Sequence, residues 1–397
     1  VSHGRNIPLL AVLEIFRAFF GIRADDEPQA AREKIDHRLR SIEEALGEMS
    51  PLVFDFLGVA DPSSPTPQMD PDARQRQLLA LMRHVINRAG STQVTVTLIE
   101  DLHWMDAASE QFLEHMVDAR DGARSLLLLT YRPEYHPKWM KNAWCRQIAL
   151  APLGRSALQE LLADLLGTDR SLAGLAALIE QRANGNPFFV EEIVQTLRET
   201  GHLEGERGAY QLVSSVEKLE VPVTVAAVVA ARIDRLAERE RQLLQVASVI
   251  GAEFSEPLLA AVAGLPHGEL TAALSSLRRS EFIVERSLFP VPIYAFKHPL
   301  AQEIALGALL KDRRRQIHGA VARALDQEPG RPEERAALLA HHWEEAGECF
   351  LAARAHRDAG EWVGLTALNA AASPWGRVRP QVKNLAEVPE AAGLGLM

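Results

Sequence analysis

The sequence VTVTLIEDLHWMD at residues 94–106 is an apolar, β-branched run that ends in two adjacent carboxylates, Glu100 and Asp101. A second apolar run, SLLLLT at residues 125–130, follows it after a helical stretch. Two buried strands joined by a helix predict a βαβ unit with parallel strands. The carboxyl ends of both strands then lie at one edge of the sheet, where doubly wound folds place their ligands.

Polar residues follow each of these strands. Glu100 and Asp101 could hold a hydrated Mg²⁺ and orient a water at a phosphate, although a core strand that ends in a polar turn also explains the pair. Thr130 and Arg132 end the second strand. An arginine fixed at that edge can pair with a γ-phosphate, and a solvated arginine before Pro133 is the alternative.

Two further segments combine structural and ligand-binding signals. In GNPFFVEEI at 185–193, Asn186 is suited to cap a helix and Pro187 to occupy its first turn, where a missing N–H costs nothing. The proline ring could also pack on an adenine. His298, in FKHPL at 296–300, follows an apolar segment, and a lone histidine there is more often structural than a ligand contact.

Periodicity predicts that most of the remaining chain is helical. We expect helices at 7–20, 28–57, 72–89, 107–119, 172–182, 187–199, in several short pieces within 224–286, and from 312 to the end. Another helix opens at Ser156 with a capping box to Gln159. Segments 282–285 and 293–296 predict a hairpin, and helices followed by a hairpin are typical of a winged-helix module.

Composition narrows the class of protein. The chain has 397 residues, enough for two to four domains, and its net charge of −10 argues against sequence-independent binding to nucleic acid. Two cysteines, Cys145 and Cys349, exclude a disulfide framework and favour a reducing, cytoplasmic setting. No apolar run is long enough to span a bilayer. No GxxxxGK[ST] phosphate loop, HExxH helix or GxSxG elbow occurs in the sequence.

Six segments, taken in order, resemble the signalling ATPases with numerous domains, the STAND class of P-loop NTPases. The resemblance is to the AAA-type ATPase module that follows a class III adenylate/guanylate cyclase domain in many bacterial proteins. The segments are NIPLL at 6–10, IEDLHWMD at 99–106, LLLLTYRPEY at 126–135, LAPL at 150–153, GNPFFVEEI at 185–193 and FKHPLAQEIAL at 296–306. Two more, AHHWEEAGE at 340–348 and AGEWVGL at 359–365, resemble the start of tetratricopeptide-like repeats.

This resemblance implies a mostly helical chain with an incomplete α/β P-loop core. We expect the end of that core at 1–150, a helical lid domain at 151–213, a winged-helix domain at 214–311 and the start of helical repeats at 312–397. In this family the Walker A phosphate loop precedes the segment that residues 6–10 resemble. The resemblance therefore implies a chain that begins after that loop and stops within the repeats.

The resemblance also assigns roles to site residues. Glu100 and Asp101 match the Walker B acids, and either could be the acid on the Mg²⁺ side. Thr130 and Arg132 match the sensor 1 segment. Pro187 is similar in position to a proline that packs on adenine. His298 is similar in position to a histidine that contacts the diphosphate of bound ADP in closed states. His298 departs from the family pattern because Pro299, rather than an acid, follows it.

The implied function is an ATP-dependent signalling switch that uses ATP, ADP and Mg²⁺. Its repeats would receive a protein or small-molecule signal, an upstream cyclase domain would give the output, and homo-oligomers would be compatible with this scheme. Without a phosphate loop we expect the chain itself to be an inactive ATPase. An inert scaffold and an ATP-dependent transcriptional regulator are the alternatives. The regulator is disfavoured because basic residues stand only at the end of the candidate recognition helix 267–279.

Overall fold

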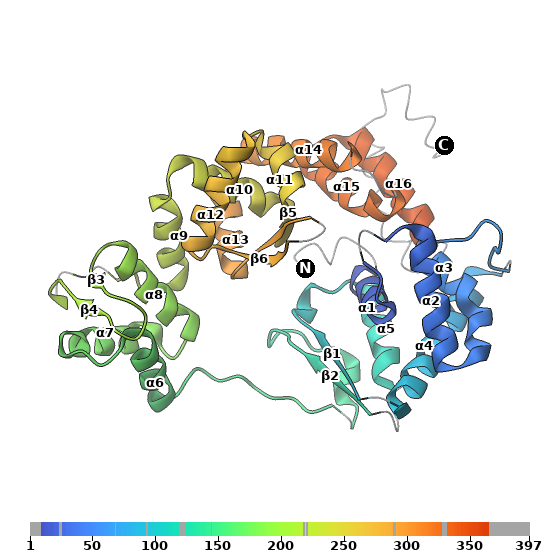
Figure 1. Cartoon of the computed structure of the whole chain (residues 1–397), viewed down its shortest axis with the longest axis horizontal. Coiled ribbons are helices and arrows are strands. Elements are labelled where there is room, and N and C mark those ends of the chain that lie inside the picture. Colours follow the sequence, from blue (N-terminus) through green and yellow to red (C-terminus); the bar gives the residue numbers. More distant parts are fainter. Residues whose placement is uncertain are drawn as a thin grey trace.

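The computed structural model describes residues 9–364, except 24–25, 68, 93, 119–123, 144, 217–218, 220, 289–290 and 328–331. Figure 1 shows an α/β part in blue and teal, a helical part in green, a mixed part in yellow and orange, and helices in red at the end of the described chain. The repeats expected beyond residue 364 lie outside the described residues.

The α/β part contains the predicted βαβ unit. Strand β1 (Thr95–Ile99) pairs with β2 (Ser125–Leu129) in parallel, and α5 (Ala107–Asp118) connects them. The other elements of this part are α1 (Leu10–Phe20), α2 (Pro28–Ile42), η1 (Glu44–Met49), α3 (Ser50–Phe56), α4 (Pro71–Thr92), η2 (Leu102–Trp104) and η3 (Lys138–Lys141). The helical stretch expected over 28–57 consists of α2, η1 and α3. It is interrupted at Glu43, which is extended, and α3 has Pro51, which lacks an N–H, in its first turn.

The two faces of the small sheet have different surroundings. Ile99, Leu127 and Leu129 pack on one face against a cluster that includes residues of α5 and Trp139 of η3. On the other face Val96, Leu98, Leu126 and Leu128 are between 47% and 62% exposed. Parallel sheets are normally covered on both faces, so this apolar surface is unusual for a parallel sheet.

The helical part consists of α6 (Arg155–Leu166), η4 (Arg170–Leu172), α7 (Ala173–Ala183), α8 (Pro187–Glu199) and a short hairpin, β3 (Leu203–Glu204) with β4 (Gln211–Leu212). Asn186 caps α8 as predicted, because its Oδ1 accepts the N–H of Phe189 at 3.2 Å. The capping box at Ser156 is wrong. Helix α6 begins after Gly154, and the Ser156 hydroxyl lies 3.5 Å from Glu160.

Four helices and a three-stranded antiparallel sheet follow. They are α9 (Val225–Arg235), α10 (Glu238–Ile250), β5 (Glu253–Ser255), α11 (Glu256–Ala263), α12 (His267–Arg279), β6 (Ile283–Ser287) and β7 (Ile293–Phe296), and α13 (Pro299–Gly307) closes the group. The predicted hairpin is confirmed as β6–β7. Strand β5 was not predicted, and it pairs with β7 to give the order β5-β7-β6.

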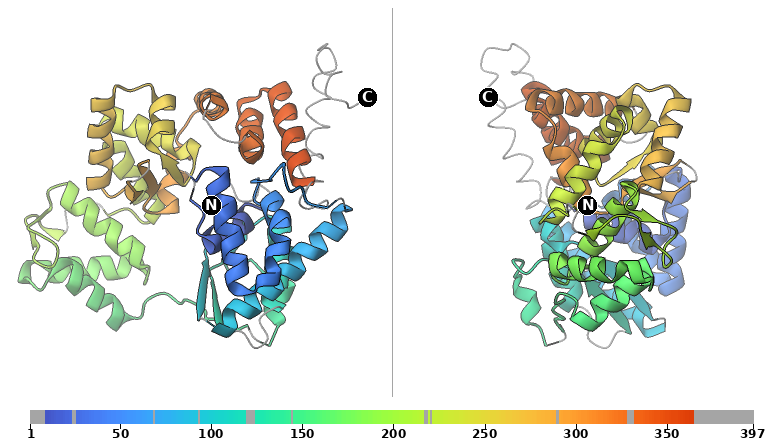
Figure 2. Two further views of the ribbon diagram at one scale, coloured as in Figure 1. Left: turned by 45° about the vertical axis from the view of Figure 1, so that its right-hand side comes forward. Right: turned by 90° about the vertical axis from the view of Figure 1, so that its left-hand side faces the viewer.

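The last helices are α14 (Lys311–Gln327), α15 (Pro332–Ala346) and α16 (Cys349–Gly364). One apolar core runs without interruption from α9 to α16, from Val229 to Ala355. A second, small cluster joins Ala336 and Ala359 to Leu10 of α1. The C-terminal helices therefore contact the α/β part, and the left view in Figure 2 shows the red helices next to the blue ones.

No single helix in the described part of the chain is long and apolar enough to cross a membrane. Only α11 and α12, taken together as a pair bent by 116°, meet the length and composition criteria.

An extended segment connects the α/β part to the helical part (Figure 1). Residues 145–153 have no helix or strand, and Ile148 and Leu150 are 75% and 92% exposed. The segment joins the helical part where the Leu153 N–H donates to the carbonyl of Gly185 at 2.8 Å.

A buried arginine joins the helical part to the mixed part. Arg232 of α9 is 2% exposed and donates to Glu192 at 2.7 Å, to Glu199 at 2.7 and 3.0 Å, and to the carbonyl of Ser280. Its guanidinium also lies 4.7 Å from the ring centre of Phe282. Burial raises the pKa of Glu192, and the charge of Arg232 opposes that shift. The arginine thus holds α8, α9 and the end of α12 together.

We expect Arg232→Met to destabilise the fold by about 3–5 kcal/mol, because it leaves the buried carboxylate of Glu192 without its cation. Urea unfolding measures the change. Arg207→Met is the matched control, since Arg207 pairs with Asp164 in a bridge in which both side chains are 66% exposed, and such bridges contribute little. A cost for Arg232→Met no larger than that of the control would contradict the role of this joint.

Candidate functional site

The carboxyl ends of β1 and β2 are joined by hydrogen bonds beyond the strand ladder. The N–H of Asp101 donates to Oγ1 of Thr130 at 2.9 Å, and the N–H of Leu102 donates to the Thr130 carbonyl at 2.9 Å. The N–H of Thr130 donates in turn to the carbonyl of Ile99 at 3.1 Å. Thr130 therefore fixes the turn that carries Glu100 and Asp101.

This turn has an unusual backbone. Asp101 has φ 57° and ψ 45°, in the left-handed region that aspartate tolerates better than most residues. Leu102 next to it is buried at 1% exposure, which anchors the turn, while the Asp101 side chain stays 49% exposed. Nδ1 of His103 lies 3.9 Å from Oδ1 of Asp101. We did not predict a role for His103, although it stands within the motif segment.

Asp106, the third acid of the segment, is hydrogen-bonded to the first turn of α5. Oδ1 of Asp106 accepts the N–H groups of Ala108 and Ser109 at 3.0 Å, and Oδ2 accepts the Ser109 hydroxyl at 2.5 Å. Asp106 thus caps α5. Glu100 and Asp101 remain as the acids of the motif that face solvent.

Glu100 and Asp101 could bind Mg²⁺ only together with ligands that do not come from the described side chains. Among the residues with described positions, no group of three or more His, Cys, Asp or Glu side chains could hold a metal ion. Mg²⁺ is often bound through one or two carboxylates, with phosphate oxygens and waters completing the shell. The two exposed carboxylates match that arrangement, so a cation here would depend on a bound phosphate.

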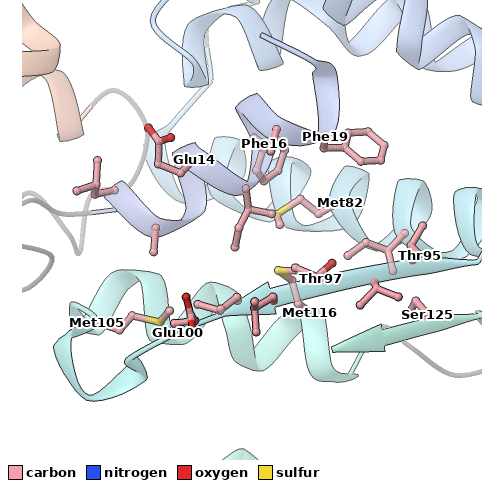
Figure 3. A pocket seen from close by; sticks show the side chains of 18 of the residues that line it. Glu14, Phe16, Phe19, Met82, Thr95, Thr97, Glu100, Met105, Met116 and Ser125 are labelled. Carbon is pink, nitrogen blue, oxygen red and sulfur yellow. The ribbon is translucent and has the colours of Figure 1, made fainter. Parts of the chain in front are cut away.

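A cavity of about 820 Å³ lies along β1, between the strand and helices α1 and α4 (Figure 3). Its walls are mainly apolar, with side chains that include Phe16, Phe19, Met82, Met105 and Met116. The carboxylates of Glu14 and Glu100 stand toward one end. A polyphosphate requires N–H donors and cations, which these walls do not supply. The cavity is therefore not a phosphate cradle.

Arg132 follows the end of β2 and approaches a residue of another element, α13. Its side chain is 59% exposed, and Nη2 lies 4.0 Å from Oε1 of Glu303 on α13. We predicted that Arg132 would reach the edge that carries Glu100 and Asp101, and we did not foresee Glu303. An exposed ion pair at this distance is weak, so the pair with Glu303 contributes little free energy to fixing the Arg132 side chain.

Pro187 and His298 belong to neighbouring helix N-termini. Pro187 occupies the first turn of α8, and the ring of the next residue, Phe188, lies 4.1 Å from the imidazole of His298. His298 is the N-cap residue of α13. Burial, together with the charge of Lys297, lowers the pKa of His298, so its imidazole is neutral at pH 7.

The predicted site residues therefore form two sets. One set is at the sheet edge and contains Glu100, Asp101 and Thr130; the other is at the N-termini of α8 and α13 and contains Pro187 and His298. Arg132 follows the sheet edge and reaches α13 through Glu303, so it is the residue that connects them.

One comparison with known proteins concerns the N-terminal part of the chain, which contains β1 and β2. Residues 1–129 match the AAA ATPase domain family. The α/β part is similar to AAA ATPase domains. This match confirms the expected relationship to AAA-type ATPases for the N-terminal part of the chain. Residues 154–208 match a domain of unknown function, DUF8739, which covers much of the helical part.

Two longer matches cover most of the chain. Over 305 residues the chain is 28% identical to an uncharacterized protein of Rhizobium meliloti (strain 1021). The matched region makes up 74% of this chain and 28% of that protein. The chain thus spans less than a third of the length of this curated relative. It is also similar, at 11% identity and a TM-score of 0.46, to the crystal structure of a Signal Transduction ATPase with Numerous Domains (STAND) protein with a tetratricopeptide repeat sensor from Pyrococcus horikoshii, over 91% of this chain and 58% of that one.

We expect residues 1–397 to bind Mg·ATP weakly or not at all. The sequence holds no phosphate loop, and neither Glu100 and Asp101 nor the walls of the cavity can replace its backbone N–H groups and lysine. Isothermal titration calorimetry of the chain with Mg·ATP measures this directly. Micromolar affinity would show that another part of the chain binds the phosphates.

Proposed function

We propose that these residues are the acid- and sensor-bearing part of an ATP-driven signalling switch, within a parent protein that also carries a phosphate loop. The observation that carries the proposal is the hydrogen bond from Asp101 to Thr130, which joins the Walker B-like and sensor 1-like strand ends at one edge. The AAA ATPase match over residues 1–129 supports it. The exposed apolar face of the sheet offers a surface for the remaining elements of a P-loop core.

Glu100 and Asp101 would hold Mg²⁺, partly through water, and orient the attacking water. The Mg²⁺ supplies neutralisation of the phosphate charge when ATP is bound. Thr130 keeps both carboxylates on a rigid turn, so that little reorganisation is needed when nucleotide binds. Arg132 would exchange its weak partner Glu303 for the γ-phosphate, since a charge-assisted bond to phosphate is the stronger interaction.

The second set of residues would contact the rest of the nucleotide. The N-terminus of α8 would place Pro187 against the adenine. His298 would donate a hydrogen bond to the diphosphate of ADP in the closed state. Strand order β5-β7-β6 with α10, α11 and α12 supports a winged-helix assignment for this region. We keep the domain limits 1–150, 151–213, 214–311 and 312–397 in this proposal.

Input and output would lie at opposite ends of the parent. Helices α14–α16 would begin a tetratricopeptide-like sensor that receives a protein or small-molecule signal. Their contact with Leu10 of α1 gives the sensor a direct physical connection to the α/β part. The output would be an upstream adenylate or guanylate cyclase domain in the cytoplasm.

The surface of α12 supports a packing role better than recognition of DNA. Thr271, Ala272 and Ser275 are exposed and small, and Arg278 pairs with Glu285 at 2.8 Å. A helix that reads bases presents arginine, lysine, asparagine or glutamine along its exposed face. The transcriptional-regulator alternative therefore gains no support from this helix.

We expect Asp101→Asn in the parent to slow ATP hydrolysis more than it weakens ATP binding. A carboxylate that orients water acts mainly in the transition state, so kcat falls while KM changes little. Glu100→Gln should instead raise the Mg²⁺ concentration needed for activity. Steady-state kinetics over a series of Mg²⁺ concentrations separates the two, and exchanged effects would reverse the two assignments.

We expect His298→Ala in the parent to speed ADP release by about ten- to a hundredfold. A hydrogen bond to a charged group contributes roughly 1.5–3 kcal/mol, and its loss removes that much preference for the closed state. Stopped-flow release of a fluorescent ADP analogue gives the rate, and a thermal melt serves as control. A lower melting temperature with an unchanged release rate would leave His298 with a structural role only.

A further inference from the structure

Two buried histidines face each other between the first two helices of the C-terminal group. Nδ1 of His318 on α14 lies 2.9 Å from Nδ1 of His342 on α15, and the residues are 3% and 0% exposed. The ring of His341 stands nearly perpendicular to that of His318, with 5.7 Å between their centres. We propose that the His318–His342 pair is a proton-sensitive latch that holds α14 against α15 and releases it in acid.

The hydrogen bond between the two imidazoles forms only when one of the two facing Nδ1 atoms carries a proton and the other does not. A hydrogen bond between two imidazole nitrogens needs one Nδ1–H donor and one Nδ1 lone pair. A first extra proton can go to the far nitrogen of the donor ring and leave the bond intact. A second proton must occupy the accepting Nδ1, which puts two N–H groups of two cations face to face at 2.9 Å. Because the pair is buried, water cannot separate these charges unless the helices part.

The carboxylates with described side chains on α15 each have a partner outside the pair. Glu345 pairs with Arg314 of α14 at 3.2 Å, and Glu344 lies 3.4 Å from the buried His356 of α16. Acid is thus expected to loosen α14 from α15, where the two imidazoles of the pair face each other.

Most charged residues of α10 and α11, two other helices packed on α14, have partners other than the two histidines. Arg239 of α10 pairs with Glu269 of α12, and Arg241 of α10 pairs with Glu238. Glu256, the one titratable residue of α11, lies 3.3 Å from the hydroxyl of Tyr294. Among the described side chains, the remaining charged groups on these helices and on α16 are Glu240 of α10, Lys311, Asp312, Arg313, Arg315, Arg323 and Asp326 of α14, and Arg354, Arg357 and Asp358 of α16.

The latch lies between two groups of helices. Helix α14 shares its apolar core with α10, α11 and α12, whereas α15 and α16 also contact Leu10 of α1. Parting α14 from α15 would therefore free the C-terminal helices, together with their contact to the α/β part, from the rest of the chain. The direction follows from proton linkage. The open state takes up the protons, so the closed state loses stability as the pH falls below the ordinary histidine value of about 6.5.

Hydrogen exchange of residues 1–397, followed by mass spectrometry at about pH 7.5 and about pH 5.5, tests the latch. After correction for intrinsic rates, we expect amides of α14 and α15 to lose at least about tenfold in protection, since one linked proton gives a factor of ten per pH unit. Amides of α10 and α12 should change little. Equal loss across all helices, or no loss at α14 and α15, would overturn the proposal.

His342→Asn is the decisive variant, because an amide can pair with Nδ1 of His318 but does not titrate in this range. The acid-dependent loss in α14 and α15 should shrink severalfold in this variant and stay unchanged in His136→Asn, where the replaced histidine is exposed in a loop. An unchanged acid response in His342→Asn would overturn the latch. If that variant does not fold, histidine ¹⁵N NMR of the wild-type chain decides: both rings must take up protons as α14 and α15 open, and rings that stay neutral to about pH 5 contradict the proposal.

Discussion

The hydrogen bond between the Asp101 amide and the Thr130 hydroxyl is the constraint on which the arrangement of the sheet edge depends. It forms just past the last ladder pair, Ile99 and Leu129, beside two backbone hydrogen bonds of Thr130 that also join the strand ends. It also keeps Asp101 in the left-handed region, which turns Leu102 into the core and leaves the two carboxylates outside. Helix α5 then begins at Ala107, after Asp106 has capped it.

The parts of the fold that depend on local sequence could be predicted. β-Branched residues and leucines gave β1 and β2, and the Asn186–Pro187 pair gave the start of α8 because cap and first turn are fixed by neighbouring residues. The carboxylate pair could be found in the same way, since it directly follows a strand. Ser156 misled us because Gly154 can begin a helix without a side-chain cap.

Features that depend on distant residues could not be predicted. Arg232 is a charged residue in an amphipathic helix, and its pattern indicates exposure. It is buried because Glu199 and Glu192, which are 33 and 40 positions away, converge on it. Glu303 and Arg132, which are far apart in the sequence, approach each other for the same kind of reason. No periodicity records such pairings, because they arise only when separately folded parts dock.

The extended segment at 145–153 changes what the weak contacts across the molecule can do. A 4.0 Å ion pair and a few alanine contacts around Leu10 would not hold two separate proteins together at cellular concentrations. Joined by one short connection, the same surfaces meet at an effective concentration in the millimolar range. Contacts of marginal strength are then populated without being permanent. A binding event of modest free energy at either end is enough to close or separate the two halves of the chain.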